Sequence, residues 1–367
     1  MNVAIIGGGA CGLLLGSYLQ RQKIQYTIFE KRECGRKLLA SGNGKANLAN
    51  RKVTLEDYHH HRLAYDIVTS YREKLWAYFK TIGLYTKEDE EGRIYPFSES
   101  SQTVLDCLFR PPLKVLKNIS VDSIQKISGR YYINSIYGPF DYVVCASGSV
   151  ASFVMKKQQG YYDYLKSLKV KMTELRPSLV GFQTSLDLTK IAGTRAKATV
   201  TLKQKERIIH RESGEIIFKK DGISGICILN LSSYYAHLKD QSNCTVHVDL
   251  LSGLDIRISK PDDLVGLFHP KLVLFFNNHP EILPPVHDFV LPVTGVYDFE
   301  FAQVVCGGVE TDQLNPDLSL IRDPHLFFGG EVLAVDGLCG GYNLMFAFCC
   351  ALKIGETLCS IKSTPSK

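Results

Sequence analysis

The sequence lacks the marks of several protein classes. None of its 11 cysteines stands in a C-x-x-C pair, so neither a zinc site of that spacing nor a thioredoxin-type redox pair is predicted. An odd number of cysteines in a chain of this size favours free thiols and a cytoplasmic location. Lysine and arginine form no block, and the net charge of +6 is modest, which argues against a nucleic-acid partner.

Long apolar runs are also absent. The run 344–352 is too short to span a bilayer, and the apolar N-terminus has no basic residue before it and is interrupted by three glycines. We therefore expect neither a signal peptide nor a membrane partner. A hydrophobic content of 45% with 22% charged residues favours a soluble globular protein, and 367 residues suffice for about two domains.

The strongest pattern lies at the start of the chain. An apolar run, 3–6, is followed by the turn GGGACG (7–12), by apolar residues on a helical face, and by a second apolar run that ends in Glu30. A G-x-G-x-x-G motif between a buried strand and a helix is typical of dinucleotide binding. We expect Gly7 to allow the tight turn, Gly9 to let a pyrophosphate approach, and Gly12 to let the helix pack on the strand.

Glu30 indicates which dinucleotide the turn would bind. It follows Gly12 by 18 residues, where its carboxylate can accept hydrogen bonds from ribose hydroxyls and would repel a 2′-phosphate. The free N–H groups at the helix start would hold the phosphates. The pattern therefore predicts FAD or NAD rather than NADP. The alternative is an ordinary strand–helix–strand unit whose glycine turn binds no ligand.

A loop rich in serine, glycine and asparagine follows, with the sequence GRKLLASGNGKAN at 35–47. Such a loop exposes backbone N–H groups to a flat ring or a phosphate, although a flexible surface loop has the same composition. The loop resembles the G-R-K-L-L-x-S-G-x-G-x-x-N signature of the bacterial FAD flavoprotein family that includes aminoacetone oxidase and the bile-acid reductase flavoprotein BaiN. Further stretches resemble motifs of that family in the same order, at 92–96, 221–225, 306–309 and 329–344.

This resemblance implies an FAD site assembled from both ends of the chain. It also implies that the residue matching Val121 contacts adenine through its backbone. The residues predicted to bind the cofactor are Gly7, Gly9, Ala10, Cys11, Gly12, Glu30, Lys31, Arg36, Lys37, Leu38, Ser41, Gly42, Asn43, Asn47, Val121, Ala146, Ser147, Gly148, Gly330, Glu331, Gly341, Tyr342, Asn343 and Leu344. No catalytic residue and no metal site is predicted, because the adjacent histidines 59–61 lack the spacing of metal ligands.

The predicted fold class is α/β, with a discontinuous Rossmann-type FAD-binding domain at 1–150 and 304–367. Alternating apolar runs such as 198–202 and 246–250 predict an inserted antiparallel β-rich substrate domain at 151–260 and 286–303. The stretch 261–285 is expected to be a small helical or irregular insert, which looks trimmed relative to the larger helical domain of the family.

Two classes of function remain open. The first is an FAD-dependent oxidoreductase acting on a small organic substrate by hydride transfer to or from flavin, either as an oxidase or as a reductase fed by transiently bound NAD(P)H. No second G-x-G-x-x-G with a strand before it and an acid after it occurs, so only one dinucleotide is expected to stay bound. The second class is a non-catalytic flavin-binding sensor or scaffold, suggested by the bulky segment 149–157, where the family has glycine and threonine.

Overall fold

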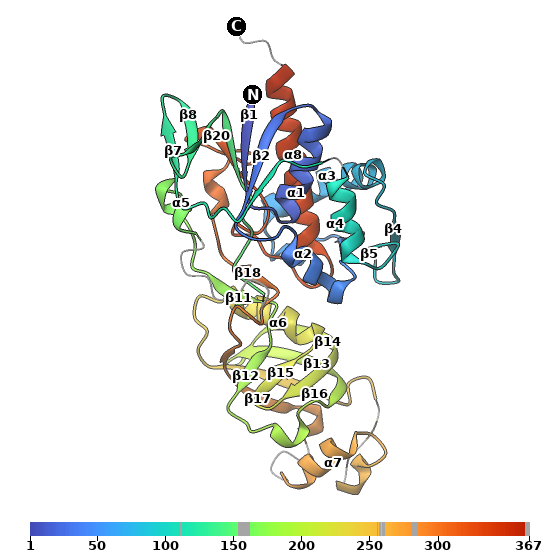
Figure 1. Ribbon diagram of the computed structural model, residues 1–367. Helices are drawn as coiled ribbons and strands as arrows, with labels where there is room; N and C mark the ends of the chain where they lie inside the picture. The colour runs from blue at the N-terminus through green and yellow to red at the C-terminus, as the bar shows by residue number, and fades with distance from the viewer. Residues whose placement is uncertain are drawn as a thin grey trace. The chain divides into compact units, whose positions relative to one another are not determined.

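The computed structural model describes residues 1–110, 112–152, 162–254, 256, 258, 261–279 and 285–363. The chain forms two compact units, each with its own sheet system (Figure 1). The first unit comprises Met1–Leu175 and Gly307–Lys367, and the second comprises Arg176–Cys306.

The first unit is built on a six-stranded sheet that joins the two ends of the chain. Neighbouring strands are parallel except at the β19 edge, which is antiparallel. In sheet order the strands are β19 (Ser319–Leu320), β20 (Asp323–Phe328), β10 (Tyr142–Cys145), β1 (Asn2–Ile6), β2 (Gln25–Glu30) and β6 (Val115–Lys117). Because β20 pairs directly with β10, the predicted discontinuous Rossmann-type sheet is confirmed.

The central strands β1, β2 and β10 are buried along most of their length because both faces of the sheet are covered. On β2, Ile28 points at Gly16 of α1 (Ala10–Arg21), where an added Cβ would lie 2.7 Å from the isoleucine side chain. The next residue, Phe29, points to the other face, where its ring contacts Tyr137 and Phe140 with centroids 5.3 and 5.8 Å away. Figure 1 shows α1, α3 (Arg62–Thr81) and α8 (Tyr342–Ser363) together on one side of the sheet.

Helix α8 is apolar and long enough to span a bilayer by length and composition alone. The prediction that no segment spans a bilayer considered only the apolar run 344–352, which is shorter than α8. Most of its apolar window is buried inside the first unit, where Gly355 lies against the ring of Tyr18 on α1. This burial is that of a core helix.

Smaller elements surround the main sheet. One three-stranded antiparallel sheet consists of β3, which precedes α3 in the chain, and of β4 and β5, which follow it. A second three-stranded antiparallel sheet consists of β7, β8 and β9, which lie between β6 and β10 in the chain. These elements are α2 (Arg36–Ala40), η1 (Ser41–Gly44), β3 (Ala49–Asn50), η2 (Glu56–Tyr58), β4 (Thr86–Glu88), β5 (Arg93–Pro96), α4 (Ser101–Phe109), β7 (Ile124–Ile127), β8 (Arg130–Ile133), β9 (Tyr137–Phe140), α5 (Asp163–Ser167) and η8 (Thr311–Gln313).

The second unit is a closed antiparallel barrel, which confirms the predicted antiparallel β-rich insert. In barrel order its strands are β12 (Phe182–Thr184), β15 (Gly222–Ser224), β14 (Arg207–Lys219), β13 (Arg195–Gln204), β16 (Cys244–Asp249) and β17 (Phe289–Val296). The remaining elements are β11 (Arg176–Ser178) paired with β18 (Val304–Cys306), η4 (Thr189–Ile191), α6 (Ile226–Ala236), η5 (Pro261–Leu264), α7 (Pro270–Asn277) and η7 (Pro285–His287).

The barrel closes around side chains that alternate along its strands. Val200 and Leu202 of β13 and Val246 and Val248 of β16 are fully buried and share one apolar core. Helix α7, which lies in the predicted insert, adds Phe276 to the same core. The stretch 261–285 therefore contributes to the core of the barrel in its described part.

The boundaries of the units differ from the predicted ones at 150 and 304. The first unit continues to Leu175 because α5 is held to the small sheet by Ser167, whose hydroxyl accepts a hydrogen bond from the Ile124 N–H at 3.3 Å. The return crossing lies at Gly307, because Val304–Cys306 is a strand of the second unit. Of the altered segment 149–157, residues 153–157 lie outside the described residues.

Candidate functional site

The glycine turn between β1 and α1 gives its three motif glycines different surroundings. Gly7 has φ +109°, and a Cβ there would lie 2.5 Å from the Ala146 carbonyl oxygen. A Cβ on Gly12 would lie 2.0 Å from the Gly7 carbonyl oxygen, so the helix touches the turn directly. Apart from the two chain neighbours of Gly9, no described residue has an atom within 4 Å of a Cβ placed there. The turn therefore leaves open space at one glycine, beside the start of α1.

The start of α1 has the properties of an anion site. Gly9 is the N-cap residue, and no capping side chain accepts a hydrogen bond from the first N–H groups of the helix. The helix dipole adds about half a positive charge at this end. Ala10 and Cys11 begin the helix, and burial raises the pKa of the Cys11 thiol, which keeps it neutral. A phosphate group beside Gly9 would meet backbone N–H groups and no opposing charge from Cys11.

Glu30 lies at the end of β2 beside the same turn. Its carboxylate accepts hydrogen bonds from the Gly8 N–H at 2.7 Å and from the Arg32 N–H at 2.9 Å, which fix its orientation. The Glu30 carbonyl oxygen accepts from the Ile119 N–H at 3.0 Å, so the loop that carries Val121 leaves β6 next to Glu30. Lys31 follows and is exposed. These residues form the end of the site predicted for the adenosine half of a dinucleotide.

The serine- and glycine-rich loop lies beside the turn. Gly35, with φ +70°, donates its N–H to the Gly8 carbonyl oxygen at 2.8 Å. Leu38 is buried, and its carbonyl oxygen accepts from the Ser41 hydroxyl at 2.7 Å. Gly42 and Asn43 both have positive φ and are exposed in η1, whereas Arg36 is half-buried. The loop therefore begins beside the glycine turn and exposes its backbone at 42–43.

Lys37, Ser149 and Glu331 meet in one hydrogen-bonded network. The Lys37 ammonium lies 2.5 Å from the Glu331 carboxylate and donates to the Ser149 hydroxyl at 2.9 Å, and that hydroxyl donates to Glu331 at 3.1 Å. Gly330 lies against the start of α1, since its Cβ would be 3.2 Å from the Cys11 Cβ. The network thus adjoins the helix start.

Ser149 and two tyrosines of this region were missed by sequence reasoning. The Tyr162 hydroxyl donates to the Gly148 carbonyl oxygen at 3.2 Å, and the Tyr164 hydroxyl lies 2.8 Å from the Ser147 hydroxyl. Burial and the Glu331 carboxylate raise the pKa of Tyr162. For Ser149, the signal that could have identified it was its position directly after the predicted cofactor residues 146–148. No such signal pointed to the tyrosines, which the sequence analysis assigned to the β-rich domain.

The start of α8 joins the site through the loop that ends at Asn47. In the amide orientation that satisfies both groups, Asn47 accepts from the Gly341 N–H at 3.3 Å and donates to the Ala49 carbonyl oxygen at 3.1 Å. Gly341 has φ +96°, and a Cβ there would lie 2.5 Å from Ala49. This glycine is therefore required for packing against the loop, whatever it does for a ligand.

Tyr342, Asn343 and Leu344 form the first turn of α8. Asn343 does not cap its own helix: its amide donates to the Gly337 carbonyl oxygen at 2.8 Å and accepts from the Gly337 N–H at 2.9 Å, which fixes the preceding loop. The Tyr342 side chain is buried, and its hydroxyl donates to the Lys52 carbonyl oxygen at 3.1 Å. Leu344 is half-buried. The predicted cofactor residues of the two chain ends thus lie in one region of the first unit.

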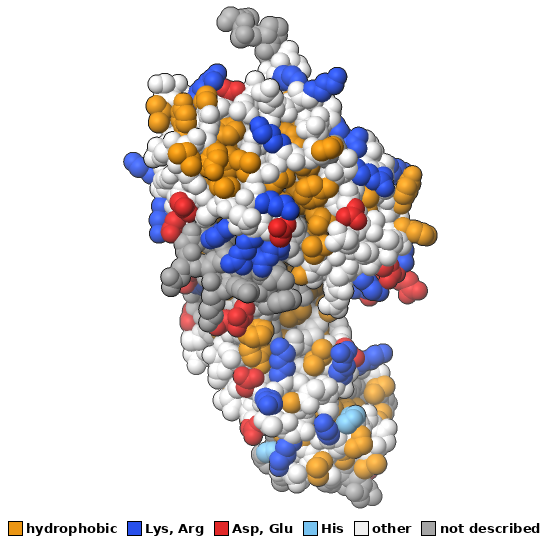
Figure 2. Space-filling view, in the orientation of Figure 1, with side chains coloured by type: hydrophobic (Ala, Val, Ile, Leu, Met, Phe, Trp, Pro, Cys, Tyr) orange, Lys and Arg blue, Asp and Glu red, His pale blue; other side chains and the backbone are white. Residues whose placement is uncertain are grey.

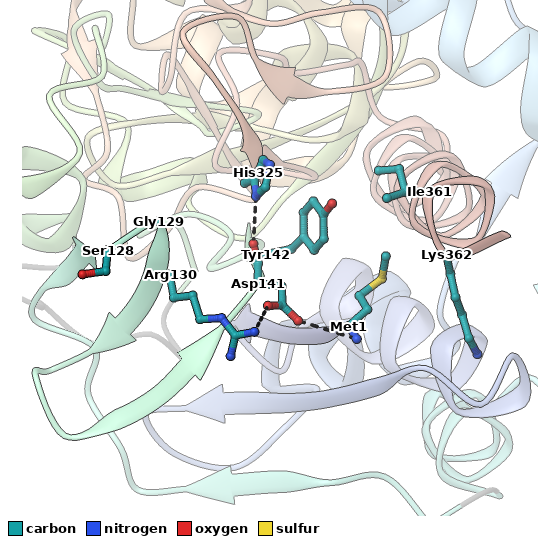
Figure 3. A pocket seen from close by; sticks show the side chains of 9 residues that line it. All are labelled: Met1, Ser128, Gly129, Arg130, Asp141, Tyr142, His325, Ile361 and Lys362. Atoms are coloured by element: carbon teal, nitrogen blue, oxygen red, sulfur yellow. Dashed lines mark hydrogen bonds and ion pairs between the residues drawn. The ribbon is translucent and has the colours of Figure 1, made fainter. Parts of the chain in front are cut away.

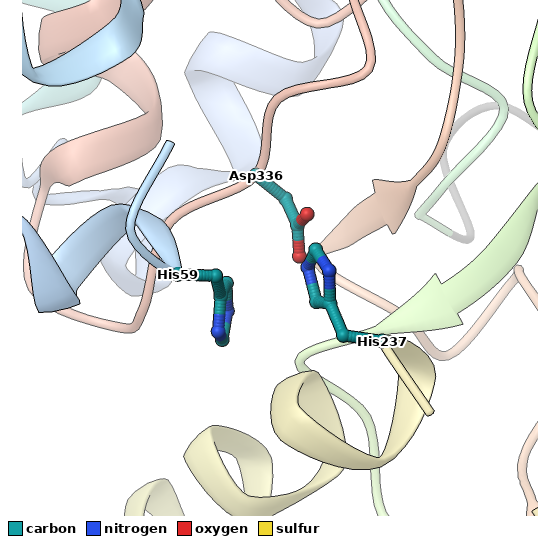
Figure 4. Close-up of side chains that lie close together, drawn as sticks. All are labelled: His59, His237 and Asp336. Atoms are coloured by element: carbon teal, nitrogen blue, oxygen red, sulfur yellow. The ribbon is translucent and has the colours of Figure 1, made fainter. Parts of the chain in front are cut away.

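The histidines 59–61 do not act together. His59 and His60 have positive φ, and His61 caps α3 by accepting from the Ala64 N–H, while its other ring nitrogen lies 3.2 Å from the Thr311 hydroxyl. Figure 4 shows His59 and Asp336 of the first unit together with a histidine, His237, of the second unit. Because these three side chains belong to two different units, we assign no metal site to them.

An open pocket of about 490 Å³ lies at the amino-terminal ends of β1, β10 and β20, opposite the strand ends that the glycine turn follows (Figure 3). Its lining residues are Met1, Ser128, Gly129, Arg130, Asp141, Tyr142, His325, Ile361 and Lys362. None of the predicted cofactor residues lines it. Ligands of open α/β sheets bind at the carboxyl ends of the strands, and the glycine turn, Ser149 and Glu331 all follow such ends.

The first unit therefore has the fold and the glycine turn of a Rossmann-type dinucleotide-binding protein. Residues 1–357 match the family described as HI0933-like protein Rossmann domain, and the chain belongs to this family. It is similar to the 3-dehydro-bile acid delta(4,6)-reductase of Clostridium scindens, with 28% identity over 95% of this chain and 96% of that protein. It is also similar to the ribosomal RNA dihydrouridine synthase of Haemophilus influenzae, with 24% identity over 96% and 98% of the two chains.

Among solved structures, the chain resembles the open conformation of a flavocytochrome c3 fumarate reductase. The TM-score is 0.52 with 12% identity, and the match covers 99% of this chain and 78% of that one. A likeness at this identity shows the shared fold. Together, the family, the relatives and the fold make the chain an FAD-dependent oxidoreductase, which confirms the enzyme class and the family expected from the motifs.

Proposed function

We propose that this protein reduces a carbon–carbon double bond conjugated to a carbonyl group in a small organic molecule, by hydride transfer from FAD. The observation that carries the cofactor half is the open space at Gly9 beside an uncapped helix start, with the Glu30 carboxylate 2.7 Å from the Gly8 N–H at the same turn. The two relatives support the reaction. One name specifies reduction at the delta(4,6) positions of a 3-dehydro bile acid, and the other specifies formation of dihydrouridine. Both reactions saturate a ring double bond conjugated to a carbonyl.

The residues of the first unit fit FAD in an extended arrangement. The start of α1 would hold the pyrophosphate, Glu30 the adenosine ribose, and the backbone near Val121 the adenine. Glu331, at the end of β20, would accept from a hydroxyl of the ribityl chain. Bound FAD would supply the hydride, while the chain binds and orients both partners.

Reduced FAD requires an electron donor, and we propose NAD(P)H bound in passing. Because the sequence has one dinucleotide motif, the nicotinamide would share the flavin site rather than occupy a second Rossmann turn. The test is anaerobic mixing of the purified holoprotein with NADH or NADPH. The yellow flavin absorbance should bleach, and adding a cyclic enone should restore it. Bleaching that only oxygen reverses would indicate an oxidase instead.

A ribosomal RNA base is the second candidate substrate, because two relatives are named ribosomal RNA dihydrouridine synthase. The Escherichia coli protein, with 22% identity over 99% of both chains, is the second of them. On the face shown in Figure 2, many lysine and arginine side chains lie among acidic and hydrophobic ones, but several gather in the middle of the view. Uridine-containing RNA serves as the second arm of the test: reoxidation of the reduced protein by RNA but not by the enone would favour the second candidate. We further propose a cytoplasmic location, in line with the odd number of cysteines in the sequence.

Replacing Glu30 with alanine should weaken FAD binding by roughly 1–3 kcal/mol, because a ribose hydroxyl and the Gly8 N–H would both lose their acceptor. Titration of the flavin-free protein with FAD, followed by quenching of flavin fluorescence, measures this change. Glu33→Ala is the matched control, since Glu33 forms an exposed ion pair with Lys117. Equal affinities of the two variants would remove Glu30 from the site.

A further inference from the structure

Ser149 links two opposite charges at the edge of the main sheet where the strands end. It is fully buried, accepts a hydrogen bond from Lys37 at 2.9 Å and donates one to Glu331 at 3.1 Å. We propose that Ser149 is a positioning residue for the cofactor, and that with Lys37 it keeps Glu331 oriented and charge-compensated beside the pyrophosphate site. This inference rests on the proposed FAD site.

The three residues come from three different strand ends. Lys37 lies on α2, after β2; Ser149 follows β10; and Glu331 follows β20. In the sheet, β20 and β10 are neighbours, and β1 stands between β10 and β2. The carboxyl ends of these parallel strands meet at one edge, so residues 112 and 294 positions apart in the sequence become partners. Every member of the network therefore lies at the edge where a dinucleotide binds.

The serine hydroxyl suits this task because it has one hydrogen to donate and lone pairs to accept. The Lys37 ammonium donates to a lone pair of the Ser149 hydroxyl, and that hydroxyl donates its hydrogen to the Glu331 carboxylate. The charges of Lys37 and Glu331 therefore set the direction of both hydrogen bonds. Alanine would break both bonds and leave two half-buried charges with fewer restraints. Hydrogen bonds to charged groups correspond to roughly ten- to a hundredfold in an equilibrium constant.

The position of Glu331 creates the need for Lys37. Gly330 lies against Cys11 in the first turn of α1, which places the next residue, Glu331, near the helix start. An uncompensated carboxylate there would repel a pyrophosphate and would compete with it for the positive end of the helix dipole. The Lys37 ammonium, 2.5 Å from Glu331, cancels that charge. The carboxylate can then serve as an acceptor for cofactor hydroxyls without weakening phosphate binding.

The test is a mutant cycle on the flavin-free protein, with dissociation constants for FAD read from fluorescence quenching. Ser149→Ala should weaken FAD binding by about tenfold or more. Lys37→Met should weaken it further, and adding Glu331→Gln to Lys37→Met should restore part of the loss, because the repelling charge is then gone. In that double background Ser149→Ala should have little further effect. Riboflavin, which has no pyrophosphate, should be far less sensitive to Lys37→Met than FAD.

Ser17→Ala is the matched control, because Ser17 is also fully buried in the first unit and accepts one side-chain hydrogen bond, from Tyr78 at 2.8 Å. It should leave FAD affinity unchanged. Wild-type affinity in Ser149→Ala overturns the proposal, as does additivity of the Lys37 and Glu331 changes. Should Ser149→Ala fail to fold, the FAD affinities of Lys37→Met and of Lys37→Met with Glu331→Gln test the proposal by themselves. Failure of the wild-type protein to bind FAD would refute the proposed function, which is a distinct outcome.

Discussion

Replacing Gly12 with alanine is expected to unfold the first unit or to leave it severely destabilised. The added Cβ would lie 2.0 Å from the Gly7 carbonyl oxygen and 3.3 Å from the Ile5 side chain. The first of these atoms is backbone, and the peptide plane to which it belongs is held by the hydrogen bond from the Gly8 N–H to the Glu30 carboxylate at 2.7 Å, so this oxygen cannot turn aside. Helix α1 would have to move off β1, at a cost of about 3–5 kcal/mol. That is a large part of a typical stability of about 5–15 kcal/mol.

Urea denaturation followed by circular dichroism measures this loss, and the yield of soluble protein reports it independently. Gly16→Ala is the matched control on the same helix. Its Cβ would lie 2.7 Å from the far end of the flexible Ile28 side chain, which can shift. The gain of about 1 kcal/mol in helix propensity offsets part of that strain, so we expect a small net change. If Gly12→Ala is as stable as Gly16→Ala, the close contact of helix and turn is not what this glycine provides.

The first 30 residues could be predicted because their signal is local. The pairing of β1 with β2, the turn between them and the position of Glu30 all depend on residues within one strand–helix–strand unit. The apolar run of β1 and the glycine spacing carry this information without the rest of the chain. In the structure a Cβ would lie 2.5 Å from backbone at Gly7 and 2.0 Å from backbone at Gly12, whereas the role of Gly9 toward a pyrophosphate stays a prediction.

The remainder of the candidate site could be predicted only as a set of segments. Resemblance to family motifs placed Lys37 and Glu331 at the cofactor, but their pairing joins residues 294 positions apart, and nothing local encodes it. Ser149 was missed for the same reason. Asn343 shows the limit of position-based reasoning: a residue at a helix start suggests a cap, yet its amide is used by Gly337 in the preceding loop.

The barrel illustrates the same division at the level of the fold. Alternation of apolar residues predicts antiparallel strands such as β13 and β16. Closure depends on β12 pairing with both β15 and β17, which are far apart in the sequence. The first unit extends past the predicted boundary at 150 through contacts of the short helix α5 that no local pattern encodes, such as Ser167 with Ile124 and Tyr164 with Ser147.

Replacing Gly9 with alanine should strongly weaken FAD binding while leaving the fold intact. Gly9 has φ −87° and ψ −168°, an extended conformation that alanine adopts without strain. Apart from the two chain neighbours, no described residue has an atom within 4 Å of the added Cβ, so the methyl group clashes with none of them. The same methyl group would occupy the space through which the pyrophosphate approaches the N–H groups of α1. We expect the affinity for FAD to fall by roughly a hundredfold or more, which is about 3 kcal/mol.

Two measurements separate this outcome from simple misfolding. The urea midpoint of flavin-free Gly9→Ala should equal that of the flavin-free wild type or exceed it slightly, because alanine narrows the unfolded ensemble. The dissociation constant for FAD, from fluorescence quenching, should rise, and the purified variant should be colourless where the wild type is yellow. The contrast with Gly12→Ala is the internal control: one glycine in the motif is needed by the fold and the other by the ligand. A yellow, stable Gly9→Ala protein with wild-type affinity would place the pyrophosphate elsewhere.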